Sequence, residues 1–488
     1  MWRALKALAA RTELHGAAFA TLAAAILFAH LGETHLANFD DCYYAQKAKE
    51  MVRGGDWLTP HFAGIPRLDN APLFLWLMAL AMRVLGVTNF AAILFSAVSG
   101  VLCIVLVRRV ALRLGFDAFT AWMAAFVLLT TQYFMKYARH AMFDVFLTLL
   151  FLFAVDRYLV ARAGRPRQWI WVGVAAGLGV LTKSALGPFP LAVCLLHFVL
   201  TRGPSALRDP WPWAAAGACI LTFLPWYVYS AIVHGERFFA EHVRWLLWER
   251  AFVLTPAKRT VAGSFDYLKG IAQTYWPWLP FALVGASRLR RDRNAGLLLA
   301  LWFVIVVGTM SLANEKKLWY VMTAFPCLAL LSSRAIGAWI RSAQARERTI
   351  AGGFAFLLAL AAVLNLTPVA SSRARRPDLQ VMARVARDAV PPGEKIWNLD
   401  QDYWGTNNQF LFYSDHELSE PLGDPRLVHE KLALGGTALL TRSGYERVAA
   451  AADSSVLAVI ARSGDWSLVR RAAAPTAPAA IPAELGGR

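Results

Sequence analysis

Residues 38–76 have the sequence NFDDCYYAQKAKEMVRGGDWLTPHFAGIPRLDNAPLFLW, a polar stretch that follows an apolar run. It opens with the adjacent acids Asp40 and Asp41 and ends with Pro72 and large apolar residues. The segment behind the acids predicts an amphipathic helix that lies on a membrane surface. Its apolar side would carry Tyr44, Ala48, Met51 and Val52, and its polar side Gln46, Lys47, Lys49 and Arg53. Both acids then lie at a helix N-terminus, where the helix dipole favours negative charge.

The composition is that of an integral membrane protein. Of the 488 residues, 57% are hydrophobic and only 17% are charged, whereas soluble chains carry about a quarter of charged residues. The apolar residues come in blocks of about 16–22, long enough to cross roughly 30 Å of hydrocarbon as a helix.

The formal net charge of +18 would favour nucleic-acid binding in a soluble protein. Here the basic residues cluster in short loops between apolar blocks, as the positive-inside rule expects, so no nucleic-acid partner is predicted. The five cysteines lie singly and mostly inside apolar blocks, without the CxxC spacing of metal sites, and are interpreted as core residues.

About eleven blocks are predicted to span the membrane. They cover residues 16–31, 90–108, 118–136, 141–160, 168–182, 186–201, 212–233, 271–287, 295–312, 318–339 and 349–369. The first block follows three basic residues and is interpreted as an uncleaved span with a cytoplasmic N-terminus. Segment 72–86 is interpreted as an interfacial or re-entrant helix.

The loops between these blocks alternate between two kinds when segment 72–86 is not counted as a span. One kind is basic, and the other is short or carries isolated polar groups. The second kind falls on the external side, and its members include Asp40, Asp41, Asp144, Lys183, His242 and Lys316. Residues 1–370 are therefore predicted to form a transmembrane domain with large external loops at 33–88 and 234–268.

Two charged residues at helix ends are candidates for function. Asp144 is expected about one turn into an apolar helix, where an unpaired charge is expensive and usually faces a cavity or a partner. Arg139 and His140, one turn earlier, leave a structural ion pair as the alternative reading of this acid. Lys183 is the sole basic residue of an external turn, and it either snorkels to the interface or binds an anion.

Further cations fall on the external side, at Arg244, Arg250, Lys316 and Lys317, with Tyr320 close behind. A phosphate-bearing ligand would account for them. The sequence has no GxGxxG, Walker, HExxH or GxSxG motif. A donor carried on a membrane lipid phosphate is therefore favoured over a nucleotide-activated donor.

The chain changes character after residue 370. An amphipathic helix, a Pro-Pro-Gly turn, short strands near 436–441 and 455–461 and a helix at 442–453 predict a small external α/β domain over 371–471. The Ala/Pro-rich residues 472–488 are predicted to be disordered. Asp400 and Asp402 have the DxD spacing of nucleotide-sugar metal sites, a pattern too common to carry a prediction.

The first external loop resembles the signature of the aminoarabinose transferase and protein O-mannosyltransferase superfamily, GT-C glycosyltransferases that use polyprenyl-phosphate sugars. The matching features are Asp40-Asp41, Tyr44-Ala45, Gly55-Asp56-Trp57, Pro60-His61-Phe62, Gly64 and Pro72-Leu73-Phe74. HAMFDVFL, LTKSALG, FFAEHVRWL and SLANEKKLWY follow in the family's order, so the resemblance covers roughly residues 14–340. It implies the GT-C fold.

The resemblance also implies roles for single residues. Asp40 would be the catalytic carboxylate beside Asp41, and Asp144 a second acid that lines the cavity. The donor phosphate would be bound by Arg244, Lys316, Tyr320 and, as an addition, Lys183. The phosphate would leave the anomeric carbon with its charge met by these cations. Asp40 would take or orient the acceptor's proton, and attack from the opposite face would invert the anomeric centre.

A metal site is implied as well. In aminoarabinose transferases a metal can bridge a Glu of the first loop and a His of a later loop, and these align best with Asp69 and His242. The implied cofactor is a divalent ion such as zinc. The family's Glu-Lys-Pro-Pro is Asp69-Asn70-Ala71-Pro72 here, which shortens the acidic ligand and removes a lysine contact to phosphate.

The expected function is inverting hexosyl or pentosyl transfer from a polyprenyl-phosphate sugar. The acceptor stays open between lipid A, another glycolipid, a polysaccharide and a protein. The alternative is a transporter or flippase of lipid-linked sugars, but no internal repeat is found and the ionisable residues gather at external helix ends. The expected location is the bacterial inner membrane, with the active site and the C-terminal domain periplasmic.

Overall fold

The computed structural model describes residues 1–33, 35–36, 40–249, 265–289, 293–370, 377–451 and 457–472. The chain divides into two compact units. One consists of Met1–His35 and Lys47–Ser372, and the other of Leu36–Gln46 and Arg373–Arg488. The domain limits predicted at 370/371 and 471/472 stay predictions, and the predicted disordered tail from residue 473 lies outside the described residues.

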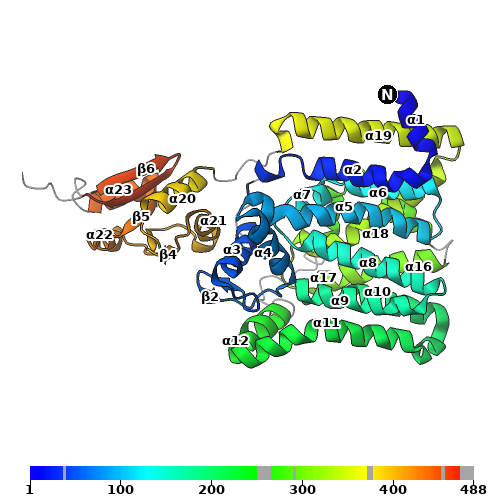
Figure 1. The fold of residues 1–488 in the computed structure, drawn as a ribbon, viewed down its shortest axis with the longest axis horizontal. Helices are drawn as coiled ribbons and strands as arrows, with labels where there is room; N and C mark the ends of the chain where they lie inside the picture. Colours follow the sequence, from blue (N-terminus) through cyan, green and yellow to red (C-terminus); the bar gives the residue numbers. More distant parts are fainter. Residues whose placement is uncertain are drawn as a thin grey trace, which may run out of the picture. The chain divides into compact units, whose positions relative to one another are not determined.

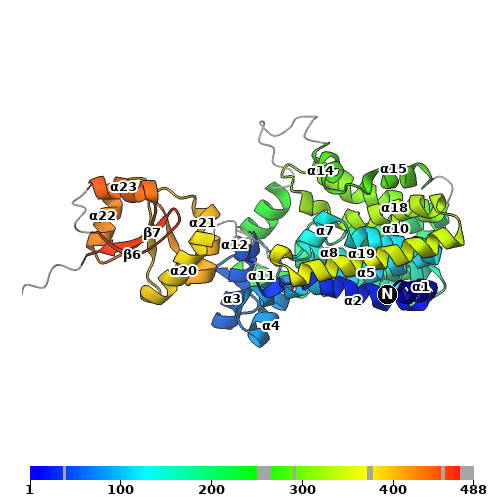
Figure 2. The same ribbon diagram turned by 90° about the horizontal axis from the view of Figure 1, so that it is seen from above.

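The first unit is a bundle of helices whose long members run roughly parallel (Figure 1). The helices of this bundle, long and short, are α1 (Trp2–Ala10), α2 (His15–Leu27), α5 (Asn89–Arg113), α6 (Ala118–Leu129), α7 (Gln132–Tyr137), α8 (Asp144–Arg162), α9 (Trp169–Lys183), α10 (Phe189–Arg202), α11 (Pro210–His234), α14 (Asp266–Thr274), α15 (Leu279–Ser287), α16 (Arg293–Phe303), the π-helical η9 (Val304–Gly308), α17 (Thr309–Leu312), the 3-10 helix η10 (Leu318–Ala324), α18 (Phe325–Trp339) and α19 (Ala343–Leu366). Figure 2 shows α15 on one flank of this bundle and α1 and α2 on the opposite flank.

Seven helical stretches among the described residues are long and apolar enough to cross a membrane. They are Thr12–Glu33, Asn89–Arg113, Phe189–Arg208, Pro210–His234, Asn294–Leu312, Leu318–Trp339 and Ala343–Leu366. The predicted class of polytopic helical membrane protein is therefore confirmed, and the count of eleven spans stays a prediction. Other predicted blocks are shortened by breaks, as between α14 and α15, where Pro277 has no N–H to continue a helix.

Helices α9 and α11 approach each other closely through two glycines. A Cβ atom on Gly173 would lie 1.9 Å from the carbonyl oxygen of Ala215, and one on Gly177 would lie 2.6 Å from that of Cys219. Small residues spaced by four let the backbones of membrane helices pack together. This contact fixes the position of α9, which carries Lys183 at its end.

Helix α8 carries a buried acid near each end. Asp144 is its first residue, and Asp156 lies twelve residues later, roughly 18 Å along the axis. The side chain of Asp156 is fully buried and pairs with Arg157, Arg113 and Arg109, the last with 3.2 Å between Nε and Oδ1. One carboxylate thus joins the basic C-terminal parts of α5 and α8.

The loop predicted at 33–88 contains α3 (Asp40–Gly54), a two-stranded hairpin of β1 (His61–Phe62) and β2 (Ile65–Pro66), and α4 (Leu73–Leu85), the short apolar helix expected at 72–86. Ala63 and Gly64 turn the hairpin with positive φ, and their N–H groups donate to the carboxylate of Glu50 at 2.9 and 3.1 Å.

The amphipathic pattern predicted for α3 is wrong on its polar side. Gln46, Lys47 and Lys49 are buried rather than exposed to solvent. The buried cations have partners instead of water, as the Lys47 contacts described below show. This helix is embedded rather than resting on a surface.

All five cysteines are free and buried, so the prediction that they are core residues is confirmed. The long second loop is described at its start by α12 (Glu236–Phe238) and the π-helix η5 (Phe239–Glu249). Residues 250–264, with the predicted cation Arg250, lie outside the described residues.

The second unit is built on a five-stranded sheet in the order β4-β3-β5-β7-β6. Its elements are α20 (Pro377–Ala389), β3 (Ile396–Asn398), α21 (Tyr403–Ser414), β4 (Leu418–Pro421), α22 (Pro425–Ala433), β5 (Thr437–Thr441), α23 (Arg442–Ala451), β6 (Leu457–Ser463) and β7 (Trp466–Arg471). Strand β3 is parallel to β4 and β5, whereas β7 is antiparallel to β5 and β6.

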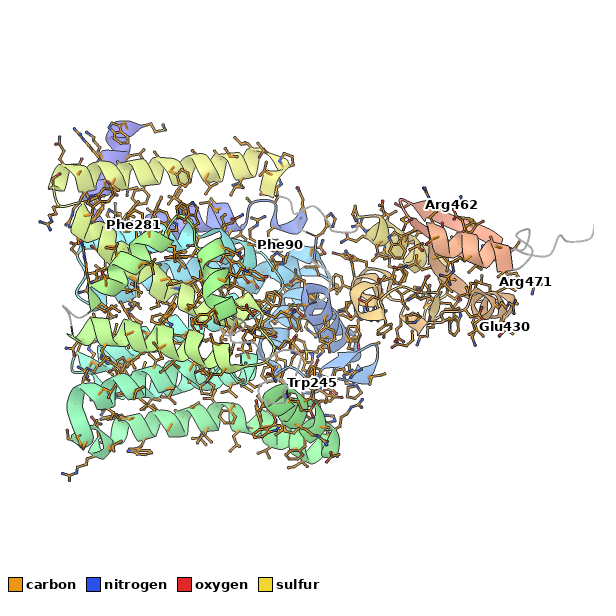
Figure 3. The ribbon with its side chains drawn as sticks, turned by 180° about the vertical axis from the view of Figure 1, so that it is seen from behind. Phe90, Trp245, Phe281, Glu430, Arg462 and Arg471 are labelled. Carbon is orange, nitrogen blue, oxygen red and sulfur yellow. The ribbon has the colours of Figure 1, made fainter. Side chains whose placement is uncertain are left out.

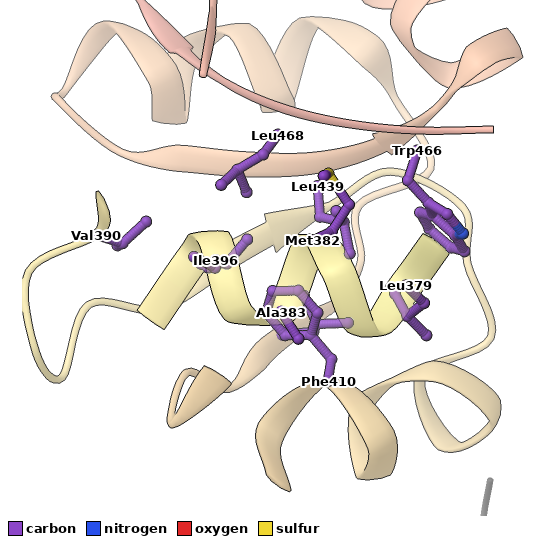
Figure 4. Close-up of a cluster of buried hydrophobic side chains, with 11 residues drawn as sticks. Leu379, Met382, Ala383, Val390, Ile396, Phe410, Leu439, Trp466 and Leu468 are labelled. Carbon is purple, nitrogen blue, oxygen red and sulfur yellow. The ribbon is translucent and has the colours of Figure 1, made fainter. Parts of the chain in front are cut away.

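Helices cover both faces of this sheet. Figure 4 shows one face, where Met382 of α20 and Phe410 of α21 pack with Ile396 and Leu468. On the other face, α22 and α23 pack against the neighbouring residues of β5 and β7, because successive strand residues point to opposite faces. The predicted small α/β domain is confirmed as a fold. The acid of the DxD pattern at Asp400 pairs with Arg447.

The α9–α11 contact predicts that a large side chain at position 177 is not tolerated. Gly177→Leu should destabilise the bundle by about 1–3 kcal/mol or more, because the added side chain meets the Cys219 carbonyl and Thr222. Thermal unfolding in detergent measures the effect. Gly217→Leu on α11 is the matched control, since a Cβ there meets nothing within 4 Å. Equal melting temperatures for the two variants would contradict this packing.

Candidate active site

Asp144 is held at the first turn of α8, where the aligned peptide dipoles favour a carboxylate. Its side chain is 1% exposed, and Oδ1 accepts a hydrogen bond from Nζ of Lys183 at 2.6 Å. Oδ2 is buried and has no hydrogen-bond partner among the residues that the structure describes. A carboxylate oxygen in this state has a lone pair free for a ligand donor.

Lys183, the last residue of α9, joins three segments that are distant in sequence. Besides Asp144, its ammonium lies 4.2 Å from the ring centroid of Tyr320 in η10 and 5.1 Å from that of Phe143. Cation–π contacts of this kind hold an ammonium in place without neutralising it. Asp144, Lys183 and Tyr320, each predicted as a site residue, are therefore brought together. Arg139 instead donates to backbone carbonyls, including those of Ile26 and Ala29.

The other two predicted phosphate ligands have separate partners. Lys316 is half-buried and donates to the carbonyl oxygen of Ala313 at 2.9 Å. Arg244 of η5 pairs with Glu236 at 2.8 Å, and both of these side chains are largely exposed. An exposed ion pair is worth little and exchanges readily, so Arg244 is available to another anion.

Asp40 and Asp41 form the first turn of α3, in the segment Leu36–Gln46 that belongs to the second compact unit. Asp40 is half-buried and Asp41 is 3% exposed. Nearby, Cys42 approaches the carbonyl oxygen of Leu36 through its thiol. The prediction that both acids lie at a helix N-terminus is confirmed. Asp40 is more accessible to solvent than Asp41.

Lys47 anchors the end of the first loop to α3. Its fully buried ammonium pairs with Asp69 and donates to Oδ1 of Asn70 at 2.9 Å and to the carbonyl oxygen of Arg67 at 3.4 Å. Burial lowers the pKa of Lys47, and the Asp69 carboxylate opposes that shift by favouring the ammonium. This contact was not predicted, because the helical pattern of the sequence places Lys47 on a solvent-facing side.

His242 joins the second loop to the first loop and to the Lys183 turn. Nδ1 lies 2.6 Å from the carbonyl oxygen of Leu68, while Nε2 lies 2.9 Å from the Ser184 hydroxyl and 3.0 Å from the Tyr227 hydroxyl. A carbonyl oxygen only accepts, so Nδ1 carries the proton and Nε2 accepts from the hydroxyls. Burial lowers the pKa of His242, which keeps the ring neutral.

The two residues aligned with a metal site do not fit a divalent ion in this arrangement. The carboxylate of Asp69 is held by an ammonium, and both ring nitrogens of His242 are engaged by protein groups. Zinc sites in proteins use three or four such ligands. Among the described residues no group of three His, Cys, Asp or Glu side chains could hold a metal. Glu241, next to His242, instead accepts from the Leu68 N–H at 2.8 Å.

The two groups of residues are suited to different chemistry. At the junction of α8, α9 and η10, a cation and a carboxylate with a free oxygen lie side by side. This pair can bind an anion and accept a hydrogen bond from a neighbouring hydroxyl or amine. At the start of α3, a half-buried carboxylate can accept a proton.

Known proteins resemble this chain in sequence. A family model described as dolichyl-phosphate-mannose-protein mannosyltransferase matches residues 69–229. An undecaprenyl phosphate-alpha-4-amino-4-deoxy-L-arabinose arabinosyl transferase of Pseudomonas aeruginosa is 31% identical over 342 residues, which cover 67% of this chain and 61% of that protein. The corresponding protein of Erwinia tasmaniensis is 28% identical with the same coverage. The matched region thus spans less than two thirds of these relatives.

Solved structures resemble it in fold. ArnT from Cupriavidus metallidurans, determined with undecaprenyl phosphate bound, has a TM-score of 0.74 at 17% identity and covers 94% of this chain and 98% of its own. The oligosaccharyltransferase AglB from Archaeoglobus fulgidus has a TM-score of 0.56 at 13% identity, with 88% and 69% covered. The fold is therefore GT-C, the fold of polytopic membrane glycosyltransferases.

The chain is thus similar in sequence to aminoarabinose transferases over about two thirds of its length, and a protein O-mannosyltransferase family model matches part of the same region. Its fold is the one that these glycosyltransferases share.

The Lys47 contacts predict that removing the lysine charge alone destabilises the protein more than removing both charges of the Lys47–Asp69 pair. Lys47→Met should lower the free energy of unfolding by about 3 kcal/mol, because it strands the Asp69 carboxylate in a poorly hydrated place. The double variant Lys47→Met/Asp69→Asn should be less destabilised, because no charge is left unpaired. Thermal unfolding in detergent compares them.

Lys269→Met on the exposed face of α14 is the control for the loss of a lysine. A double variant that is as unstable as Lys47→Met alone would show that the ammonium is held by packing rather than by its charge partner.

Proposed function

We propose that this protein is an inverting glycosyltransferase that moves a sugar from a polyprenyl-phosphate donor to an acceptor of the cell envelope. The chemistry is hexosyl or pentosyl transfer. The proposal extends to this chain what its relatives are described as doing, because sequence identity covers only part of their length. The observation that carries it is the cluster of Asp144, Lys183 and Tyr320 at helix ends of the bundle.

That cluster suits the singly charged phosphodiester that joins a polyprenyl chain to a sugar. Lys183 offers an ammonium whose approach is fixed by two aromatic rings, and the free Oδ2 of Asp144 can accept from a hydroxyl or amine of the sugar. A fixed cation stabilises the charge that develops on the leaving phosphate without reorganising in the transition state. Lys316 and Arg244 are proposed to add to this charge at the phosphate.

Asp40 is proposed as the general base, supported by its place in the acidic pair of the first loop and by its accessibility relative to Asp41. The acceptor oxygen would form the new bond to the anomeric carbon while the bond from that carbon to the phosphate oxygen breaks. The acceptor proton goes to Asp40, and the polyprenyl phosphate leaves with the electron pair of the broken bond. Attack opposite to the leaving group inverts the anomeric centre.

The protein is a polytopic membrane protein of the ArnT type. We propose the bacterial inner membrane as its place, with a cytoplasmic N-terminus and the site and C-terminal unit on the periplasmic side. The support is the alternation of basic and non-basic loops. The acceptor can be lipid A, another glycolipid, a polysaccharide or a protein, and no group in the described site selects between them.

The role of Asp40 can be tested by its amide. Asp40→Asn keeps the size of the side chain but cannot take a proton, so transfer should fall about 10²–10⁴-fold. Binding of undecaprenyl phosphate, used as the probe, should be retained. Mass spectrometry of envelope components from a deletion strain carrying each variant identifies the product and its yield. Asp41→Asn is the matched control and should have the smaller effect, and wild-type turnover by Asp40→Asn would refute the catalytic role.

The role of Lys183 can be separated from its part in stability. Lys183→Met should weaken undecaprenyl phosphate binding about tenfold and also destabilise the fold, because it leaves Asp144 buried and unpaired. Lys183→Met/Asp144→Asn should recover stability but not affinity. Lys136→Met, an exposed lysine in α7, is the control. Recovery of affinity together with stability would assign Lys183 a structural role only.

A further inference from the structure

A cavity of about 350 Å³ lies between α6, α15, α18 and α19, away from the candidate active site. Six aromatic side chains line much of it, namely Trp122, Phe126, Trp278, Phe281, Trp339 and Phe356. Neighbouring rings are in contact, since the centroids of Trp122 and Phe126 are 5.1 Å apart and those of Phe126 and Trp278 are 6.0 Å apart. The volume is sufficient for a short length of hydrocarbon chain.

The cavity belongs to the part of the bundle that faces lipid. Trp339 is 73% exposed and Phe356 is 52% exposed, although both are large apolar side chains on helices of membrane-spanning length. Gly352, which also lines the cavity, is nine residues from the start of α19, or about 14 Å along its axis. Figure 3 shows Phe281 toward the end of the bundle that is remote from Trp245 of the second loop. The cavity, which we also call the groove, therefore opens toward the hydrocarbon core of the membrane near one membrane interface.

Two polar groups in this apolar lining lack partners. The indole N–H groups of Trp122 and Trp278 are buried and make no hydrogen bond within the described part of the chain. A buried donor left unsatisfied costs about 1–3 kcal/mol. Ordered water would need two to four polar partners at the same place, which a ring-lined cavity does not offer. A ligand with an acceptor oxygen next to an apolar chain would satisfy these donors.

Arg348 lies on the same face of α19 as residues that line the cavity. Arg348, Gly352 and Phe356 follow at intervals of four on α19, so they lie along one face of that helix. Arg348 is exposed, and among the described residues it has no ion-pair partner. Its place toward the helix start puts positive charge at the interface side of the groove, where it attracts lipid phosphate.

We propose that this cavity is a binding site for a glycerophospholipid of the membrane. One acyl chain lies among the aromatic rings, an ester carbonyl oxygen accepts from an indole N–H, and the phosphate lies near Arg348. The apolar lining, the indole N–H donors and the charge of Arg348 match the acyl chain, the ester carbonyl and the phosphate of such a lipid. A polyprenyl chain fits less well, because it has no oxygen along its length to accept the indole hydrogens. The site is independent of the proposed transfer reaction.

Gly352→Leu tests the site, because Gly352 lines the cavity and a Cβ at this position meets nothing within 4 Å, so the larger side chain should occupy part of the cavity. Native mass spectrometry of the full chain after mild delipidation should find one tightly held phospholipid on the wild type, with retention reduced about tenfold or more in the variant. Gly217→Leu, the same change on an open position of α11, should retain the lipid like the wild type.

Trp122→Phe and Trp278→Phe provide a second test that keeps the aromatic lining. Removal of an indole N–H should lower phospholipid retention several-fold in at least one of the two variants, since a net hydrogen bond contributes about 1 kcal/mol. These variants keep the proposal falsifiable if Gly352→Leu does not fold. Unchanged retention in all folded variants would overturn the proposal, as would undecaprenyl phosphate in place of a glycerophospholipid as the retained molecule.

Discussion

A charge inside a bundle of membrane helices has to be paired, and helix α8 has to satisfy this condition near both of its ends. At one end Asp144 is paired with Lys183, and at the other Asp156 is paired with arginines of two helices. Removing one member of a buried pair costs several kcal/mol, so these pairs fix α5, α8 and α9 against one another. The close α9–α11 contact at Gly173 then brings α11 into the same arrangement. A charged site at one end of the bundle follows from this packing.

The sequence predicted that Asp144 and Lys183 lie near helix ends, but it did not predict which helices are neighbours. Alternation of loop charge placed Asp144 and Lys183 on one side of the membrane, but it carries no information on which spans are adjacent. The nearer cation in sequence, Arg139, was therefore the natural partner for Asp144, whereas the structure gives it backbone carbonyls. Lys47 was assigned to solvent because helical periodicity cannot foresee a partner 22 residues away, at Asp69. The polytopic class and the C-terminal α/β domain depend on local pattern, and both were predicted.

The first and second large loops are held together by hydrogen bonds between protein groups. Glu241 and His242 hold the two backbone groups of Leu68, one accepting from its N–H and the other donating to its carbonyl. The hydroxyl of Ser184, next to Lys183, donates to the same imidazole. A buried polar network in which each member is satisfied is stiff. The position of the Lys183 turn is therefore coupled to both loops, a geometry that the alignment of Asp69 and His242 with metal ligands did not foresee.

The ion pair at Asp144 also bears on how a catalytic cycle could end. In the absence of ligand the ammonium is paired with a carboxylate, and it has to leave that partner to bind a phosphate. Breaking the ion pair costs free energy, so the net affinity for the phosphate is lower. In the proposed reaction the same exchange would run in reverse when the spent lipid phosphate departs, because Asp144 would pair with the ammonium again. A lone lysine in this place would hold the product as firmly as the donor. Competition between two anions for one cation thus favours turnover over retention of the used carrier.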